Sequence, residues 1–266
     1  MDQTFYRMFA VRYGRLERRS PQNFIGGDDH DVPMPLDYFV WVIQGEQASY
    51  VVDTGYGEET GRRRGRSITR SVAEGLGALG IDPAAVRDVI LTHLHYDHAG
   101  NHDLFPNAKY HLQDSEMAYC TGRQMCHGFL AHHYECEDVT AMVRNVFDGR
   151  VRFHDGAADF APGISLHRVG GHTGGQQVVR VSTRRGWVVL ASDAAHFYAN
   201  LARGTPFPAI YHAGEMLEGF RTLRALADSD DHIIPGHDPE VIRRYPAFSP
   251  ATEGWIVRLD QPPRRP

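Results

Sequence analysis

Residues 89–98 read Val-Ile-Leu-Thr-His-Leu-His-Tyr-Asp-His, and this stretch decides the fold. An apolar run typical of a short strand is followed at once by four metal-capable side chains within six residues: His93, His95, Asp97 and His98. The backbone turns where a strand ends, so neighbouring side chains can converge instead of alternating across a sheet. Imidazole and carboxylate together suit zinc, iron, manganese or cobalt. We therefore expect His93 and His95 to hold one ion, and Asp97 and His98 to hold a second.

Two ions need more ligands than this stretch offers, and three later turns each present one. His172 lies in the glycine-rich run 170–175, Asp193 follows the apolar run 188–190, and His237 follows Pro235-Gly236. Taken singly, an aspartate after a strand is more often a helix cap, and a histidine beside glycines is more often a turn residue. Packing alone does not generate three such turns beside a four-ligand cluster. The chain therefore predicts a dinuclear metal centre whose ligands are His93, His95, Asp97, His98, His172, Asp193 and His237.

The remaining patterns alternate between strand and helix. β-type runs at 39–43 and 49–52 predict a hairpin, and the runs 177–181 and 187–190 predict a second one. Apolar residues at helical spacing predict helices over 67–79 and 215–227. These patterns indicate a chain that mixes strands and helices throughout.

The length of 266 residues is compatible with one large domain. We expect a single domain over 1–266 with β-rich halves at about 1–110 and 150–245. A segment at about 113–147 is richer in Met, Cys, His and Glu, and we expect it to be a helical insertion between those halves.

The composition limits which classes of binding partner and which cellular locations we expect. The formal net charge is −5, which disfavours nucleic acid because phosphate binding usually shows as a basic excess. No stretch approaches the roughly 20 apolar residues that cross a bilayer, and the N-terminus does not resemble a signal peptide. We therefore expect a cytoplasmic protein without a membrane partner. The arginine run 62–64 with Arg66 is interpreted as a solvated surface, with anion binding as the alternative.

The chain has three cysteines, Cys120, Cys126 and Cys136, all in one segment. An odd, clustered set does not look like a disulfide framework, and free cysteines are usually buried thiols. A zinc cluster with the nearby histidines 127, 132 and 133 is the alternative, although the spacing matches no standard zinc finger. The role of the three thiols stays open.

The order HxHxDH, then His, then Asp, then His resembles the metallo-β-lactamase superfamily, over the stretch from Asp53 to His237. The segments 92–101 and 236–238 resemble N-acyl-homoserine lactonase-like proteins most closely. This resemblance implies an α/β fold: a four-layer αββα sandwich of two mixed β-sheets flanked by helices, with the site at one edge between the sheets.

The resemblance also assigns roles to residues. Metal 1 takes His93, His95 and His172; metal 2 takes Asp97, His98 and His237. Asp193 bridges the two ions, and Asp53 braces the metal loop from behind. The sequence departs from the lactonase pattern at one place. Where those relatives have a tyrosine three residues after the bridging Asp, this chain has His196, with Tyr198 two residues further, and either could donate a hydrogen bond to the substrate carbonyl.

The implied reaction is the opening of a lactone by a metal-bridging hydroxide. Two ions about 3.5–4 Å apart lower the pKa of a shared water toward roughly 7. Zinc is the first expectation for both ions, with iron, manganese or cobalt as alternatives, and Asp97 is the candidate proton shuttle. The expected partner is a small-molecule lactone or ester, and a homodimer stays open. Aromatic and apolar residues near the site suggest a partly apolar pocket: Phe129, Leu130, Tyr134, Phe197, Phe207 and Tyr211.

Other activities on the same metal frame compete with this reading. A thioesterase resembling glyoxalase II would need basic residues near the C-terminus, of which Arg243-Arg244 is a thin version. The net charge disfavours a nuclease-like phosphodiesterase. A penicillin-type β-lactamase often lacks the Asp97-His98 pair and is exported. A binding module without turnover is the last alternative, but seven ligands are more than a structural site needs.

Overall fold

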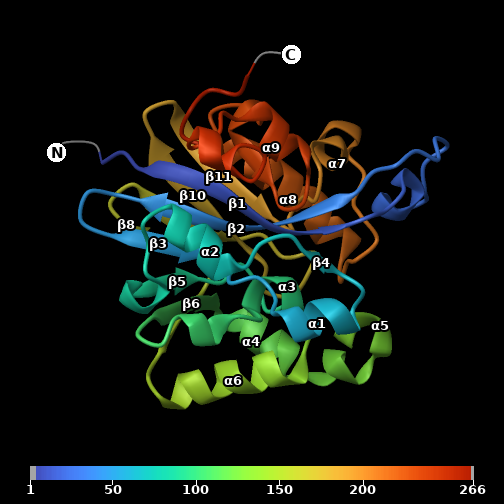
Figure 1. Cartoon of the computed structure of the whole chain (residues 1–266). Coiled ribbons are helices and arrows are strands. Elements are labelled where there is room, and N and C mark those ends of the chain that lie inside the picture. Colours follow the sequence, from blue (N-terminus) through green and yellow to red (C-terminus); the bar gives the residue numbers. More distant parts are fainter. Residues whose placement is uncertain (1–3, 265–266) are drawn as a thin grey trace.

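The computed structural model describes residues 4–264. Two mixed β-sheets lie face to face in the middle of the molecule, and helices cover both outer faces (Figure 1). The expected αββα sandwich is confirmed. Within the described residues no helix is both long and apolar enough to cross a bilayer.

The first sheet has the strand order β13-β1-β2-β3-β5-β6-β7, with β4 paired to β1. It is antiparallel from β13 to β3 and parallel from β3 to β7. Its strands are β1 (Arg7–Leu16), β2 (Leu36–Gln44), β3 (Ser49–Val52), β4 (Ser67–Ile68), β5 (Asp88–Ile90), β6 (Lys109–Gln113), β7 (Val151–His154) and β13 (Ile256–Arg258). The predicted hairpin at 39–52 is therefore present as β2 and β3.

The second sheet has the order β12-β11-β10-β9-β8. Its strands are β8 (Ala157–Ala161), β9 (Ile164–Arg168), β10 (Gln177–Thr183), β11 (Gly186–Ser192) and β12 (Ile233–Pro235). All neighbours are antiparallel except β11 and β12, which run parallel. The second predicted hairpin corresponds to β10 and β11.

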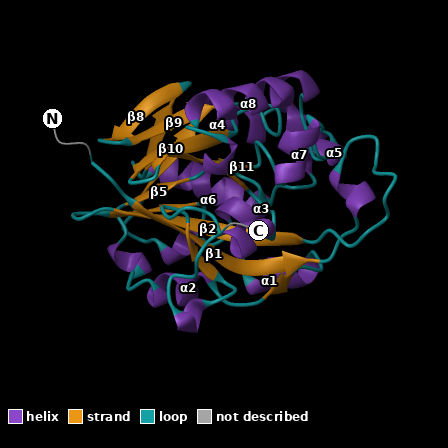
Figure 2. Ribbon diagram, turned by 90° about the horizontal axis from the view of Figure 1, so that it is seen from above, coloured by secondary structure: helices purple, strands orange, loops and turns teal. Residues whose placement is uncertain are grey.

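Helices form the outer layers, as Figure 2 shows from above. Those packed on the first sheet or beside it are α1 (Glu58–Arg63), α2 (Val72–Ala78), α3 (Tyr96–Ala99), α4 (Asp114–Cys120), α5 (Gly128–Ala131) and α6 (Cys136–Phe147). Those on the side of the second sheet are α7 (Tyr198–Arg203) and α8 (Ala213–Leu226). Helix α9 (Glu240–Arg244) contacts β1 and β13 at the edge of the first sheet. Short 3₁₀ turns are η1 (Ser20–Asn23), η2 (Pro83–Ala85), η3 (His102–Leu104), η4 (Arg123–Cys126), η5 (Asp230–His232) and η6 (Pro250–Thr252).

Strand β2 explains why the chain stacks in four layers. Its side chains point alternately to the two faces of the sheet, and both faces are buried. Tyr38 and Val40 belong to the core under the helices of the first half, whereas Phe39 and Trp41 belong to the core between the two sheets. A third core lies between β10, β11 and helix α8. A continuous apolar run buried on both faces is what a central strand requires.

The predicted helix over 67–79 is only partly correct. Residues 67–68 form β4, which pairs with β1, and the helix begins after Ser71. Ser71 caps α2: its hydroxyl accepts a hydrogen bond from the Glu74 amide, and the Glu74 carboxylate accepts one from the Ser71 amide. This reciprocal cap fixes where the helix begins and overrides the apolar spacing upstream of it.

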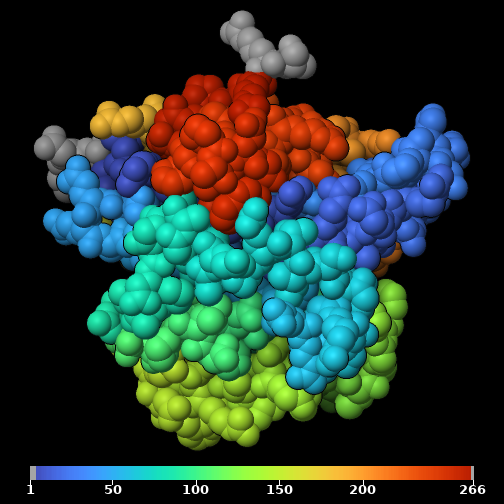
Figure 3. Space-filling view, viewed as in Figure 1, coloured from blue at the N-terminus to red at the C-terminus, as the bar shows by residue number. Residues whose placement is uncertain are grey.

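The segment between β1 and β2, residues 17–35, leaves the sheet and forms an arm that stands out at the side of the molecule (Figures 1 and 3, blue). The arm contacts the region of α7 and the loop after it. The Ile25 amide donates to the Pro206 carbonyl at 2.8 Å, and the Asn200 side chain donates to the Asn23 carbonyl at 3.2 Å. Arg203 pairs with Asp28 at 2.9 Å. These contacts hold the arm beside the strand ends that carry the candidate ligands.

Candidate metal centre

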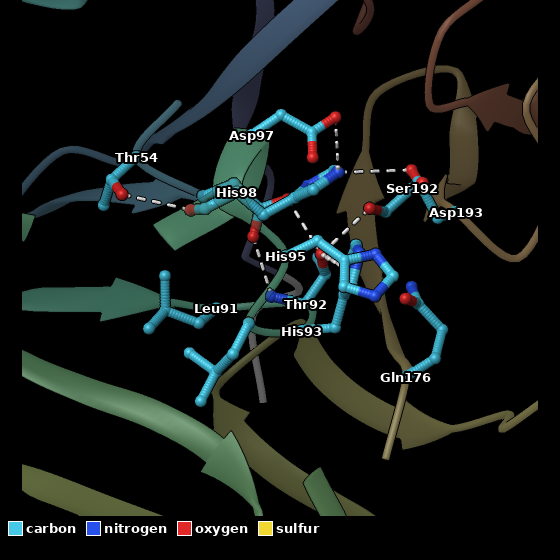
Figure 4. Close-up of polar contacts among 12 residues, drawn as sticks. Thr54, Leu91, Thr92, His93, His95, Asp97, His98, Gln176, Ser192 and Asp193 are labelled. Carbon is cyan, nitrogen blue, oxygen red and sulfur yellow. Dashed lines mark hydrogen bonds and ion pairs between the residues drawn. The ribbon is translucent and has the colours of Figure 1, made fainter. Parts of the chain in front are cut away.

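All seven predicted ligands lie at strand ends, and the fold brings them to one place. His93 and His95 follow β5, and Asp97 and His98 lie in the short helix α3. The other three come from the second sheet, after β9, β11 and β12: His172, Asp193 and His237. All seven are buried, between 0% and 8% exposed. Figure 4 shows the ligands of the first sheet beside Asp193.

Three imidazoles form the first group. Nε2 of His172 lies 3.2 Å from Nε2 of His93 and 2.8 Å from Nδ1 of His95. Three ring nitrogens that converge in this way can surround a single cation.

Asp97, His98 and His237 form the second group, in which Asp97 Oδ2 lies 3.6 Å from Nε2 of His98 and 3.7 Å from Nε2 of His237. Asp193 joins this group to the first. Its Oδ1 lies 2.9 Å from His237 Nε2 and 3.3 Å from His98 Nε2, whereas its Oδ2 lies 3.3 Å from His172 Nε2. One carboxylate oxygen therefore faces each group, which is the arrangement that a bridging ligand needs.

Buried polar atoms of the centre indicate that it can hold divalent cations. Among residues 4–264, His98 Nε2 and Asp193 Oδ1 are buried polar atoms without a hydrogen-bond partner of proper geometry. Buried polar atoms are normally satisfied, and each exception needs an explanation. A cation between these atoms would satisfy both, and mixed imidazole and carboxylate ligands suit zinc and its neighbours in the transition series.

The pKa values of the histidines in the centre are shifted in opposite directions. Burial lowers the pKa of His93 and His95 well below the usual range, and neighbouring imidazoles add to this, so both rings are neutral and ready to bind a cation. Burial also opposes protonation of His98, but the carboxylates of Asp193 and Asp97 outweigh it and hold its pKa well above the usual value. A cation that binds there must displace a proton from His98, so its affinity depends on pH.

Three of the ligand rings are oriented by an acceptor behind them. His98 Nδ1 lies 2.7 Å from Asp53 Oδ2, and His172 Nδ1 lies 2.6 Å from the Ala209 carbonyl. His237 Nδ1 lies 3.0 Å from the Asp37 carbonyl. Contacts of this kind fix the ring and the tautomer of a metal-binding histidine.

Asp53 also holds the metal loop in place. Its carboxylate accepts hydrogen bonds from the amide and the hydroxyl of Thr92, at 2.7 and 2.8 Å. The Thr92 hydroxyl meets that of Ser192 at 2.9 Å, so the ends of β5 and β11 are linked here (Figure 4). Asp53 and Ser192 are the two described non-glycine residues with positive φ, 61° and 44°. Such strain is characteristic of functional sites.

Sequence reasoning missed Glu116, a fully buried carboxylate in α4. Oε1 accepts hydrogen bonds from the Leu94 amide at 3.0 Å and the Tyr134 hydroxyl at 2.8 Å. Oε2 accepts from the Thr173 hydroxyl at 2.5 Å and the Gly175 amide at 3.1 Å. Glu116 therefore ties the His93–His95 loop to the turn that carries His172. Nothing in the local sequence distinguishes it from an exposed helical glutamate.

A cavity of about 420 Å³ opens onto the centre. Phe129 and Phe207 line it, as expected, but Phe197 is core, and Tyr211 stacks at an angle on Tyr119. Leu130 lines a smaller adjoining cavity, and Tyr134 presents its ring to His95 with 4.5 Å between centroids. The wall is more polar than expected, because the lining also includes Glu17, Arg18, Gln22, Arg66, His132 and His133.

The two candidate carbonyl donors lie in different surroundings. His196 lines the cavity, stacks on Phe207 with 3.2 Å between ring centroids, and places Nε2 2.8 Å from Asp193 Oδ2. Tyr198 is absent from the cavity lining; its ring packs under the Arg244 guanidinium at 3.9 Å and against the core between the sheets. This position favours His196 over Tyr198 as the carbonyl donor, because α7 begins at Tyr198 and its side chain packs against that core.

The cysteines take no part in this centre. Cys120 is buried, Cys126 and Cys136 are exposed, and none of them is in a disulfide. Among residues 4–264, the groups of side chains arranged to hold a cation contain no cysteine. The alternative cysteine–histidine zinc cluster therefore finds no support.

Comparison with known proteins identifies the class. The profile of the metallo-β-lactamase superfamily matches residues 34–237, a span that contains all seven candidate ligands. The chain belongs to this superfamily, and its fold and buried imidazole–carboxylate cluster define it as a metal-dependent hydrolase.

The relatives narrow the class further. The chain is 26% identical to an N-acyl homoserine lactonase of a Bacillus species over 232 residues, 80% of this chain and 86% of that protein. It is also 26% identical to the N-acyl homoserine lactonase AttM of Azorhizobium caulinodans over 277 residues, 93% and 98% of the two chains. The resemblance to lactonases is thus confirmed along most of the chain.

Solved structures share the fold. A quorum-quenching N-acyl homoserine lactone hydrolase superposes with a TM-score of 0.73 at 23% identity, over 91% of this chain and 96% of the other. AidC, described as a dizinc quorum-quenching lactonase, superposes with a TM-score of 0.66 at 16% identity, over 89% of both chains.

Proposed function

We propose that this protein opens a lactone ring with two divalent metal ions held by the seven candidate ligands. The observation that carries the proposal is Asp193, whose two oxygens face the two histidine groups at the floor of a cavity. The N-acyl homoserine lactonases to which the chain is similar supply the substrate class. His93, His95 and His172 would hold one ion, and Asp97, His98 and His237 the other.

When bound, such ions lower the pKa of water toward roughly 7 and polarise an ester carbonyl. The protein's own residues do the rest. Asp97 lines the cavity, and we assign to its carboxylate the movement of the proton from water to the leaving oxygen. His196 lines the cavity too, and we assign to its Nε2–H the hydrogen bond to the substrate carbonyl, which it could donate once the ions engage Asp193 in its place. The imidazole stack on Phe207 holds the His196 ring in one orientation.

The test is proton release in a pH-indicator assay of the metal-loaded protein. Acyl-homoserine lactones and other lactones are compared with thioesters of matched acyl groups. We expect turnover of lactones, and loss of nearly all of it in Asp193→Ala. His127→Ala is the matched control, because His127 is exposed and lies outside the candidate ligand groups. Turnover of thioesters alone would refute the lactonase assignment and favour the glyoxalase II-like alternative.

The metal and the location of the protein are further parts of the proposal. We propose zinc at both positions, which elemental analysis of the protein purified without added metal would test. We propose a cytoplasmic location, tested by cell fractionation, and a single catalytic domain over 1–266. A homodimer, which sedimentation would reveal, stays open.

A further inference from the structure

Two arginines share the cavity with the candidate metal ligands. Arg18 lies in the arm that follows β1, and Arg66 lies in the loop between α1 and β4. The two residues are 48 positions apart in sequence, and the fold brings both to the same wall. Each is partly buried, so neither is a freely solvated surface charge.

Within residues 4–264, Arg18 and Arg66 have no carboxylate within ion-pair distance, whereas several nearby arginines do. Arg63 and Arg64 both pair with Glu135. Arg15 pairs with Glu17 and Asp37, and Arg19 pairs with Asp31. Burial lowers the pKa of Arg18, and the nearby positive charge of Arg66 contributes to this. Glu17, Asp97 and Asp193 line the same cavity, but none of them lies within ion-pair distance of either guanidinium, so both guanidinium groups can still pair with an anion that enters.

Hydrogen bonds to the protein hold the two guanidinium groups in place and leave some of their N–H donors unused. Arg66 donates through Nε to the Tyr96 hydroxyl at 3.1 Å and through Nη1 to the Arg64 carbonyl at 2.8 Å. Arg18 donates through Nη2 to the Gln22 carbonyl at 2.6 Å. These bonds leave Nη2 of Arg66, and Nε and Nη1 of Arg18, free to donate to a ligand. A guanidinium held in this way matches the geometry of a carboxylate.

Tyr96 connects this wall to the candidate metal centre, because it precedes Asp97 directly and its hydroxyl also meets that of Tyr38 at 3.1 Å. The cavity volume of about 420 Å³ is in the range of sites for small molecules. A ligand anchored at the metal centre can therefore extend to the arginines within one cavity.

We propose that Arg18 and Arg66 form an anion subsite, and that the natural substrate is a lactone or ester that carries a carboxylate remote from the scissile carbonyl. The inference rests on the proposed function, because it specifies which lactone the same cavity accepts. It also replaces the interpretation of the arginine run as a solvated surface: Arg63 and Arg64 fasten the loop to Glu135, and Arg66 faces the cavity.

The test compares two substrates that differ in one group: an N-acyl homoserine lactone whose acyl chain ends in a carboxylate, and its methyl ester. The measured quantity is the ratio of the two kcat/KM values, which cancels any general loss of activity in a variant. We expect wild type to favour the carboxylate at least about tenfold, since charge-assisted hydrogen bonds to both arginines are at stake. Arg18→Gln and Arg66→Gln should each lower the ratio about tenfold, and Arg66→Lys should restore part of it.

Arg62→Gln is the matched control, because Arg62 belongs to the same run but is exposed and makes none of these contacts. A wild-type ratio near one, or a ratio that Arg62→Gln lowers as much as Arg66→Gln does, would overturn the subsite while leaving lactone hydrolysis intact. Absence of turnover with both lactones would instead refute the proposed function.

A binding measurement decides the subsite even in that case. Glutarate at constant ionic strength should raise the melting temperature of the metal-loaded wild type more than that of either Gln variant. Equal shifts in the three proteins would overturn the subsite. A larger effect of inorganic phosphate than of glutarate would overturn the choice of a carboxylate.

Discussion

Replacing Glu116 offers the sharpest test of how the candidate metal centre is assembled. Its two oxygens accept four hydrogen bonds: one from Leu94 in the His93–His95 loop, one from the Tyr134 hydroxyl, and two from the turn that carries His172. Glu116→Ala leaves the amides of Leu94 and Gly175 buried without an acceptor, at about 1–3 kcal/mol each. With the two hydroxyls that also lose their acceptor, we expect a loss of about 4 kcal/mol in the free energy of unfolding.

Glu116→Gln should cause only part of this loss of stability. The amide keeps one accepting oxygen and presents an NH₂ group to the other pair of donors, so we expect about half the loss, roughly 2 kcal/mol. Urea unfolding of the metal-free protein measures both values without a contribution from metal binding. Bound metal per chain, measured separately, should fall in both variants because the His95 loop and the His172 turn are no longer tied together.

Glu46→Ala is the control, because Glu46 is exposed in a turn, and its removal should change the unfolding free energy by less than about 0.5 kcal/mol. A Glu116→Ala protein within about 1 kcal/mol of wild type would refute this account of Glu116. A Gln variant as unstable as the Ala variant would show that the negative charge matters more than the number of acceptors.

Three further predictions concern other parts of the fold. His172→Ala should lower bound metal from two ions per chain toward one, as measured by elemental analysis. Gly175→Ala should lower the free energy of unfolding in urea by at least about 2 kcal/mol, because its Cβ would lie 2.1 Å from the Glu116 amide nitrogen. Gly77→Ala in α2 is the control: its Cβ would meet no atom within 4 Å, so it should be neutral or stabilising in the same measurement. Burial first, then the neighbouring Glu135 and Glu137 charges, raise the pKa of Asp138 to about 6. Its folded state therefore binds the proton more tightly, and wild type loses stability as the pH rises from about 4 to about 6; Asp138→Asn should gain about 1–2 kcal/mol at pH 8 and little at pH 4.

Much of the fold could be predicted from the sequence, because each candidate ligand or ligand cluster marks the end of a strand. The apolar run before His93 and the run before Asp193 are β5 and β11, and both expected hairpins are present. The predicted helix at 67–79 failed at its start, where the cap at Ser71 outweighed the apolar spacing. The helical segment 113–147 is broken into α4, η4, α5 and α6, with Gly122 and Gly128 at the breaks.

The candidate ligands could be predicted because their residue types are distinctive. The residues that hold these ligands in place could not be predicted. Glu116 and the carbonyl of Ala209 act through tertiary contacts that leave no local pattern. Arg18 and Arg66 read as ordinary surface charges, because only the folded arm and loop bring them to one cavity. Tyr198 is close to Asp193 in sequence but packs against the core between the sheets, a position that only the folded chain reveals.

The order of the candidate ligands along the chain has a consequence for biosynthesis. The first of them is residue 93 and the last is residue 237, which follows β12, a strand that pairs in parallel with β11. A chain emerging from the ribosome carries His93, His95, Asp97 and His98 long before the second sheet exists. Metal captured at that stage would meet an incomplete set of ligands, so the full dinuclear set can form only after translation has passed residue 237 and β12 has docked beside β11. The full candidate ligand set is therefore completed late in folding rather than at its start.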